Sequence, residues 1–469
     1  MIRPHVEITN GGITGGVRSG SGRLSGPRPT VPGMDTGRRA LRADLSALTY
    51  HRDVADRLER DEPNGWAIVS KLRNDRPSGT ATWGDDDDRP AADPAVALLR
   101  SSYRLEPEGH PVVHAALARA AENLGIDRPV AVYQVEGGVE ANAGLLERPD
   151  ELAILISGNL IPLLPEAGLT AVFGHELAHH RLWSLDGGRY RIADRLLELL
   201  SVDAATSPPY LETFRRYRLA TELFADRGAV VAGGDLLAAI GALVTTVTGL
   251  ADVDPAGYLA RAEAANPAAG SRATSHPETV LRAWALGRWH AELTAEPDAV
   301  PVLDRPPAGE TAVRALLRPH LDLDTLDLFD RADLERVTRN LIEDLLLDRA
   351  WHCEPVLTHA RQFFPDLPPP PATTTETVAE GDDWGSPGFA ARPLPAGTSA
   401  STRHYLSYVL LDLITVDPDL DVELSVGRAV RFAEPLGLST DLERVVRAEL
   451  LLSAAAWARI GAVAKPVSR

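Results

Sequence analysis

Two histidines and a glutamate lie close together in one apolar segment of the chain. His175, Glu176 and His179 form the pattern H-E-x-x-H within the sequence LTAVFGHELAHH. If this segment is a helix, both histidines lie on one face, about one turn apart, and can direct ring nitrogens at one metal ion. Glu176 then reaches a water molecule on that metal and can act as its general base. The pattern predicts a metal-dependent hydrolytic site, with zinc as the expected ion.

A hydrolytic zinc site needs a third protein ligand and an open position for water. The leading candidate is Glu222, which lies on a second predicted helix with Asp226 one turn later. Alone, such an E-x-x-x-D pair usually marks a solvated helix face. Together with H-E-x-x-H, it predicts that Glu222 binds the metal and that Asp226 accepts a hydrogen bond from a ligating imidazole.

A third element is Ser275-His276-Pro277, at the expected start of a further helix. The ring of His276 would then sit on a positioned loop and could donate a hydrogen bond to the oxyanion that forms when water attacks a carbonyl. A His-Pro pair also occurs at ordinary helix starts, so both interpretations stay open. Tyr210 and Tyr217 are further candidates for stabilising the oxyanion, and nothing in the sequence selects between them.

In this order, the segments GHELAHH, ELFADRGA and SHPETVLRAWAL resemble the M48 family of zinc metallopeptidases, which includes the CAAX-prenyl endopeptidases and the HtpX-type proteases. The resemblance covers roughly residues 96–290 and implies a zincin-like (gluzincin) fold that holds one Zn²⁺ per chain. The roles that it implies are zinc ligation by His175, His179 and Glu222, general base catalysis by Glu176, support of a ligand by Asp226, and contact with substrate by His276.

The segment before the predicted zinc helix adds to this resemblance. Asn142-Ala143-Gly144 and the later run ELAILISGNLIPLL look like the family's edge strand and the approach to its zinc helix. The resemblance implies that the strand near residues 151–157 binds a peptide as an added antiparallel strand. Many members of the family carry obvious transmembrane helices, and this chain has no convincing one. A prenyl-protein substrate or a membrane location is therefore not implied.

The rest of the 469-residue chain divides by composition and periodicity. We expect a mainly α protein with a small β-sheet, whose metallopeptidase domain is followed by helical C-terminal segments. Within that domain we expect strands at 129–135 and 151–157, and helices at 109–124, 166–183, 188–201, 209–232, 234–250 and 277–294. The expected units are a flexible leader (1–45), short helices and a linker (46–95), the metallopeptidase domain (96–292), a helical region (300–365), a Pro/Gly-rich linker (366–400) and a C-terminal helical region (401–469).

Composition excludes several other classes of protein. The net charge of −18 argues against a nucleic-acid partner, which needs clustered Lys and Arg. The single cysteine, Cys353, rules out an internal disulfide and any Cys-rich zinc module, and leaves histidine and carboxylate as the plausible metal ligands. The acidic run Asp85–Asp88 is read as a solvated loop.

Two further segments bear on where the chain acts. The N-terminal residues have no apolar core of signal-peptide length, so a cytoplasmic location is expected. The longest nearly uncharged stretch, residues 228–250, contains Asp235 and several Gly and Thr. We therefore expect it to form a buried helix, and membrane association is not expected.

These observations predict a zinc-dependent endopeptidase that acts on a peptide or protein substrate. Zinc lowers the pKa of its water, and Glu176 takes the proton and passes it to the leaving amine. The alternative is a non-catalytic or latent zinc-binding scaffold, or a peptide-binding protein, with the same fold. Cleavage of peptides by the wild type and by Glu176→Gln separates these hypotheses.

Overall fold

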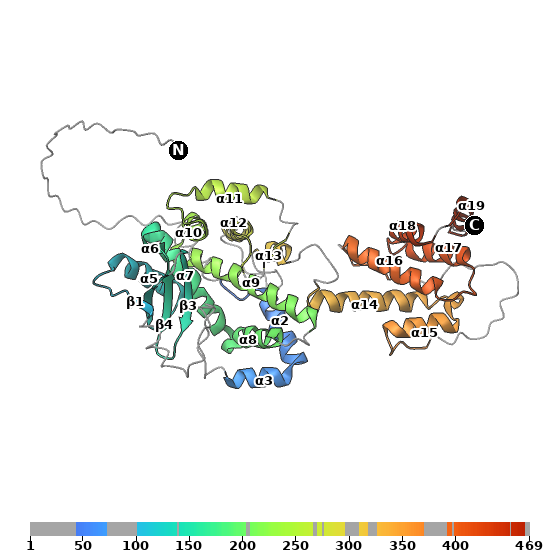
Figure 1. Cartoon of the computed structure of the whole chain (residues 1–469), viewed down its shortest axis with the longest axis horizontal. Coiled ribbons are helices and arrows are strands. Elements are labelled where there is room, and N and C mark those ends of the chain that lie inside the picture. Colours follow the sequence, from blue (N-terminus) through green and yellow to red (C-terminus); the bar gives the residue numbers. More distant parts are fainter. Residues whose placement is uncertain are drawn as a thin grey trace, which may run out of the picture.

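A computed structural model describes residues 44–72, 101–137, 140–202, 207–265, 270–273, 276–295, 309–317, 326–369, 392–395, 398–450 and 452–464. The expectations for most of the leader, for the Asp85–Asp88 run and for most of the 366–400 linker lie outside these residues. As expected from the sequence, the described chain is mainly helical with one small sheet (Figure 1).

The sheet contains four strands in the spatial order β1-β2-β4-β3. Their bounds are Ser102–Arg104 (β1), Val130–Val135 (β2), Asn142–Glu147 (β3) and Leu152–Ser157 (β4). β2 and β4 are parallel, whereas β1 pairs with β2, and β3 with β4, in antiparallel fashion. Every residue of β4, LAILIS, is buried. A continuous apolar run is typical of a strand that is covered on both faces.

The resemblance implied that the strand near residues 151–157 pairs with a peptide, and the structure contradicts this expectation. β4 already pairs with β2 on one side and with β3 on the other, so its backbone groups are used within the sheet. Among the described strands, β3 pairs only with β4. The open edge of the sheet beside residues 166–184 therefore belongs to β3. The sequence could not show this, because an apolar run marks an interior strand but does not reveal which strands lie on either side of it.

The expected helices of this region are present, with bounds that agree to within a few residues. They are α5 (Pro111–Leu124), α7 (Glu166–Ser184), α8 (Arg189–Val202), α9 (Pro208–Gly233), α10 (Leu236–Thr248) and α12 (Thr279–Ala295). The other helices are α2 (Thr49–Asp61), α3 (Pro63–Leu72), α6 (Leu160–Leu163), α11 (Pro255–Ala264) and α13 (Glu310–Leu317), and a short 3₁₀ turn, η1 (Leu185–Gly188), follows α7. The sequence patterns did not predict β1 or α11.

The uncharged stretch 228–250 is divided between two helices. Gly234, with φ of 70°, ends α9 in the left-handed conformation, and Asp235 then caps α10 by accepting hydrogen bonds from two backbone amides. Within the part of the chain that the structure describes, no helix has the length and apolar character needed to cross a membrane.

α7 and α9 pack against each other through glycines. A β-carbon added to Gly174 of α7 would lie 2.3 Å from the Cβ of Ala232, and one added to Gly228 of α9 would lie 2.2 Å from the Cβ of Ala178. Since no real β-carbons approach so closely, only glycine fits at these two positions. The backbones of the two helices consequently lie close enough for side chains of both to meet in one site.

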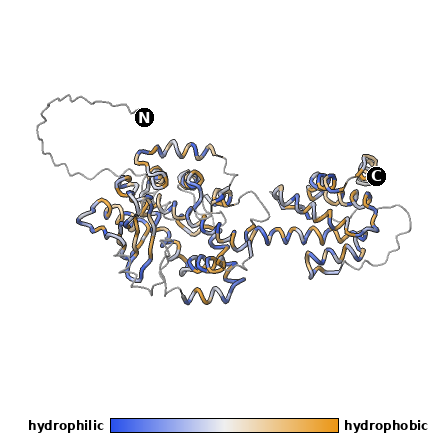
Figure 2. The backbone as a smooth tube through the Cα atoms, in the orientation of Figure 1, coloured by the Kyte–Doolittle hydropathy of each residue, from blue (hydrophilic) through white to orange (hydrophobic). Residues whose placement is uncertain are grey.

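The C-terminal helices build a second hydrophobic core, separate from the one around α7 and α9. Its helices are α14 (Leu328–Leu345), η4 (Arg349–Trp351), α15 (Glu354–Phe363), α16 (Ala400–Thr415), α17 (Val422–Ala433), α18 (Ser439–Glu449) and α19 (Ala454–Ala464). α14 joins the two parts of the molecule (Figure 1), and Arg216 of α9 pairs with Asp330 near its start at 2.8 Å. Apolar and polar residues alternate along the helices of both parts (Figure 2).

Candidate metal centre

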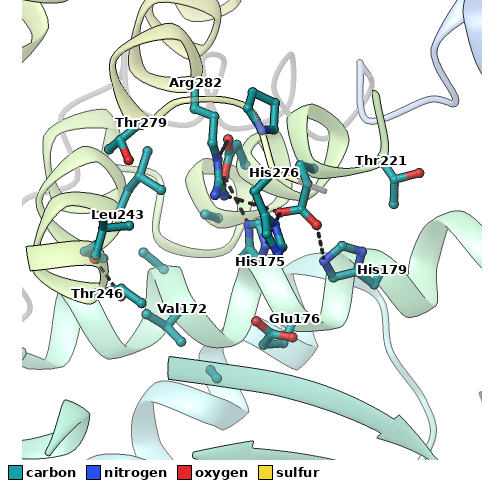
Figure 3. Close-up of a pocket in the computed structure, with 18 of the residues that line it drawn as sticks. Val172, His175, Glu176, His179, Thr221, Leu243, Thr246, His276, Thr279 and Arg282 are labelled. Carbon is teal, nitrogen blue, oxygen red and sulfur yellow. Dashed lines mark hydrogen bonds and ion pairs between the residues drawn. The ribbon is translucent and has the colours of Figure 1, made fainter. Parts of the chain in front are cut away.

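Three side chains from α7 and α9 form the candidate metal centre. His175 and His179 lie one turn apart on α7, and Glu222 faces them from α9. One ligand atom from each residue lies within 4.8 Å of the others. The Nε2 atoms of His175 and His179 are 3.5 Å and 3.8 Å from the carboxylate oxygens of Glu222. Figure 3 shows both histidine rings on the same side of α7.

Nδ1 of His179 has no hydrogen-bond partner among the described residues, and Oε2 of Glu222 makes no well-aligned hydrogen bond there, although Nδ1 of His276 lies 2.9 Å from it. A buried carboxylate surrounded by imidazole nitrogens suits a cation. Two imidazole nitrogens and one carboxylate, next to an open cavity, are the donor set that zinc takes in hydrolytic sites. The residues present therefore fit a zinc ion.

Asp226 sets the orientation of the first histidine. Its Oδ1 lies 3.1 Å from Nδ1 of His175. When Nδ1 carries the proton and donates it to this carboxylate, Nε2 keeps a lone pair directed toward Glu222. Asp226 thus occupies the position that the sequence predicted for it.

Arg282 completes this arrangement, and sequence reasoning assigned it no role. It donates to Asp226 from Nε to Oδ2 at 2.8 Å and from Nη2 to Oδ1 at 2.6 Å. The whole residue is only 8% exposed, so its charge depends on that carboxylate. The available signal was a lone cation inside the apolar helical sequence TVLRAWALG. Such a cation needs a buried partner.

The ionisable groups of the triad and Asp226 shift one another's pKa values. Burial disfavours a charged imidazole at His175, but Asp226 and Glu222 outweigh burial and raise the pKa of His175 to about 10. Burial likewise opposes the ionisation of Asp226, yet Arg282 and His175 lower the pKa of Asp226 to about 2. The neighbouring histidines overcome burial at Glu222 and hold its pKa well below the usual range. Both carboxylates are therefore ionised near neutral pH.

Glu176 lies next to the triad but outside it. The residue is 7% exposed, lines the cavity and has no hydrogen bond with any residue that the structure describes. Burial raises the pKa of Glu176 to about 7, although His175 opposes the shift. In Figure 3, Glu176 lies at the side of α7 that faces a strand of the sheet. A carboxyl group with a pKa near neutrality is suited to proton transfer.

His276 meets the triad from the opposite side. Its Nδ1 lies 2.9 Å from Oε2 of Glu222, and its side chain is 62% exposed at the rim of the cavity. The structure therefore brings His276 to the site, and its contact with substrate stays a prediction. The two tyrosine candidates are wrong. Tyr210 donates to Glu62, and the buried Tyr217 donates to the carbonyl of Tyr190, so neither hydroxyl faces the cavity.

A further contact fixes the edge strand beside the site. Glu147, the last residue of β3, is 5% exposed. Its carboxylate binds the ring of His180 on α7 and accepts a hydrogen bond from Nη1 of Arg191 on α8 at 2.5 Å. His180 thus contacts Glu147 and not the triad, and it ties β3 to the helix that carries His175 and His179.

The triad opens into a cavity of about 610 Å³. Residues 142–144 of β3 lie along one side, and α10 provides a wall of small and apolar side chains that includes Ala242 and Leu243. A cavity of this size holds several side chains of a peptide.

Comparison with protein-family models, curated proteins and solved structures gave no match. What this site can do must follow from its own residues and geometry.

Proposed function

We propose that the chain is a zinc-dependent endopeptidase of the gluzincin type, similar to the M48 metallopeptidases. The observation that carries this proposal is the buried group of His175, His179 and Glu222, with Glu176 beside it in one open cavity. A purely structural zinc site would be closed by a fourth protein ligand. Among the described residues, only these three form a metal-type group, which favours a hydrolytic role.

The sheet edge supports a peptide as the substrate. Backbone groups of β3 lie along the cavity at residues 142–144, and no other described strand pairs with that edge. An extended peptide can bind there by forming backbone hydrogen bonds with β3, and its side chains would alternate between the cavity and solvent. This mode of binding brings a peptide carbonyl next to Glu176.

A zinc ion held by His175, His179 and Glu222 would lower the pKa of a water molecule and polarise the carbonyl of the substrate. Glu176 accepts a proton from the attacking water while the oxygen of that water forms a bond to the carbonyl carbon of the peptide. Glu176 then gives the proton to the amide nitrogen, and the C–N bond breaks. Asp226 keeps the proton on Nδ1 of His175, and His276, which lies beside Glu222, would donate a hydrogen bond to the developing oxyanion.

The test combines metal analysis with a peptide-library digest of the purified chain. Wild type should contain one zinc, cleave peptides and lose activity to a chelator. Glu176→Gln should keep the metal and cleave about 100- to 10,000-fold more slowly, because only the proton acceptor is removed. Glu222→Gln should lose zinc. Glu166→Gln, at a partly exposed position in the first turn of the same helix, is the matched control and should change neither property.

Three outcomes would contradict the proposal. Equal cleavage by wild type and Glu176→Gln would exclude the mechanism. Unchanged zinc content in Glu222→Gln would exclude that ligand. One bound zinc without cleavage of any peptide would instead favour a latent or non-catalytic zinc-binding scaffold.

A further inference from the structure

Asp194 of α8 faces the cavity at the end opposite the apolar α10 wall. It lines the cavity together with Trp183 and Arg218. Trp183 lies one turn beyond His179 on α7, and their ring centroids are 5.7 Å apart. In Figure 3, Val172 of α7 and Leu243 of α10 lie toward the opposite end of α7 from His179. The cavity therefore has an apolar end and a charged end.

The carboxylate of Asp194 has no partner among the residues that the structure describes. It makes no hydrogen bond and no ion pair with them. Burial, with a smaller contribution from Glu198, raises the pKa of Asp194 to about 6, although nearby arginines oppose the shift. Asp194 is only partly buried, but even partial loss of water around an unpartnered carboxylate costs free energy, and such groups in clefts are typical of binding sites.

The cations near Asp194 have other contacts. Arg195 pairs with Glu198 at 2.6 Å, and Arg191 pairs with Glu147. The guanidinium of Arg218 lies over the ring of Phe214, 5.6 Å from its centroid, and has no ion pair with Asp194. Two acidic groups that line this cavity have no ion pair or hydrogen bond with the described residues. One is Glu176, which the proposed reaction uses, and the other is Asp194.

The direction of β3 indicates which part of a peptide reaches Asp194. The Asn142 end of β3 lines the cavity, and the Glu147 end is bonded to His180, beyond the last histidine of the H-E-x-x-H pattern. β3 and α7 therefore run in the same direction. A peptide paired antiparallel to β3 has its N-terminal end toward His180, Trp183 and Asp194.

We infer that Asp194 binds a positively charged group of the substrate on the N-terminal side of the cleaved bond. This inference rests on the proposed function, since it assumes a peptide along β3. The group is an ammonium or guanidinium, supplied either by a Lys or Arg side chain or by the free amino terminus. A cation there gives the partly buried carboxylate the charge-assisted hydrogen bond that the described chain does not provide.

The experiment measures peptide binding to zinc-loaded Glu176→Gln, so that cleavage does not interfere. The probes are C-terminally fluorescent ten-residue peptides of Ala, Leu and Ser, with one Lys moved along the N-terminal half. Each is compared with the same peptide carrying norleucine in place of Lys. All are made N-acetylated and with a free amino terminus. Fluorescence anisotropy gives the Kd.

In the Glu176→Gln protein, Lys should bind about tenfold more tightly than norleucine at one or two positions, which is the size of one charge-assisted hydrogen bond. Adding Asp194→Asn should abolish this preference. Adding Glu198→Gln, which removes the same charge one turn along α8 but outside the cavity lining, should preserve it. If the free amino terminus is the ligand, the gain follows removal of the acetyl group and is again lost with Asp194→Asn.

Equal Kd values for charged and uncharged peptides would overturn the inference, as would a preference that survives Asp194→Asn. Absence of binding by every peptide, acetylated or free, would overturn it as well. The outcome is separable from that of the proposed function. An Asp194-dependent preference in a protein that cleaves nothing supports cation binding at Asp194 and contradicts the protease. Cleavage by the wild type, without any preference of the Glu176→Gln protein for charged peptides, supports the protease and contradicts this inference.

Discussion

Arg282 holds Asp226 through two hydrogen bonds, 2.8 Å from Nε to Oδ2 and 2.6 Å from Nη2 to Oδ1. The same carboxylate contacts Nδ1 of His175. One buried carboxylate thus connects α12 to the first histidine of α7. The orientation of His175, a proposed metal ligand, depends on a residue far along the chain that lies outside the proposed ligand set.

Asp226→Asn should lower the affinity for zinc by about 10- to 100-fold, the usual effect of removing the carboxylate behind a ligating histidine. Competition with a chromogenic chelator measures this affinity. Asp235→Asn, which changes only the N-cap of α10, is the matched control and should bind zinc like the wild type. Unchanged affinity in a folded Asp226→Asn protein would show that His175 does not need this partner.

Gly228→Ala should lower the free energy of unfolding by about 1–3 kcal/mol, because the new methyl group forces α7 and α9 apart. Zinc affinity should fall in the same variant. Gly233→Ala on the same helix is the control, because an added β-carbon there meets no atom within 4 Å. Urea unfolding checks both variants, and equal stabilities would mean that the helix contact tolerates a side chain.

His51 should make the stability of the fold depend on pH. This residue is fully buried beneath α9, and burial lowers the pKa of His51 to about 3. Thr221 donates its hydroxyl proton to the carbonyl of Tyr217, so Nε2 of His51, 3.2 Å from that hydroxyl oxygen, carries the proton and donates it. The neutral ring is thus the form that folding requires.

The unfolded chain binds a proton at His51 near pH 6.5, and the folded chain does so only near pH 3. Stability from this residue is therefore present above pH 6.5 and is lost as the pH falls toward 3. Between pH 7.5 and 5.5 the loss should be about 1.4 kcal/mol. His51→Gln should lose that part of the pH dependence in urea unfolding experiments. The same dependence in variant and wild type would rule out His51 as its source.

Glu147→Gln should loosen the edge strand. The neutral amide weakens the contacts with His180 and Arg191, so we expect a loss of about 1–3 kcal/mol in the free energy of unfolding. Amide hydrogen exchange in β3 should become faster, and peptides should bind more weakly to the metal-loaded protein. Glu140→Gln, at an exposed position before β3, is the control. Unchanged exchange in β3 would show that other contacts hold the strand.

The sequence predicted most of the helices that carry the site, because their apolar residues recur at helical spacing. It also predicted β4, whose run of apolar residues is unmistakable. The local pattern predicted no strand at β3, because NAGLLE contains Asn and Gly and has weak strand propensity. Only the resemblance pointed to an edge strand near Asn142, and it assigned peptide binding to the strand near residues 151–157. The lateral order of the strands follows from tertiary packing, which local patterns do not contain.

The same distinction applies to the site. The adjacency of His175 and His179 follows from the helical period alone. The approach of Glu222 depends on the packing of two helices, and it was inferred from its spacing to Asp226. Arg282 and Asp194 were missed because each becomes significant only when separate helices are brought together.

The contact at Gly174 and Gly228 has a consequence for the precision of the site. Where helices meet through side chains, rotamer changes allow several packings of similar energy. A contact made by backbone has no rotamers, so the separation of α7 and α9 has no alternative arrangement to relax into. The ligands of the two helices thus share one preorganised geometry, and the entropy of arranging them is lost when the chain folds, before any ion binds.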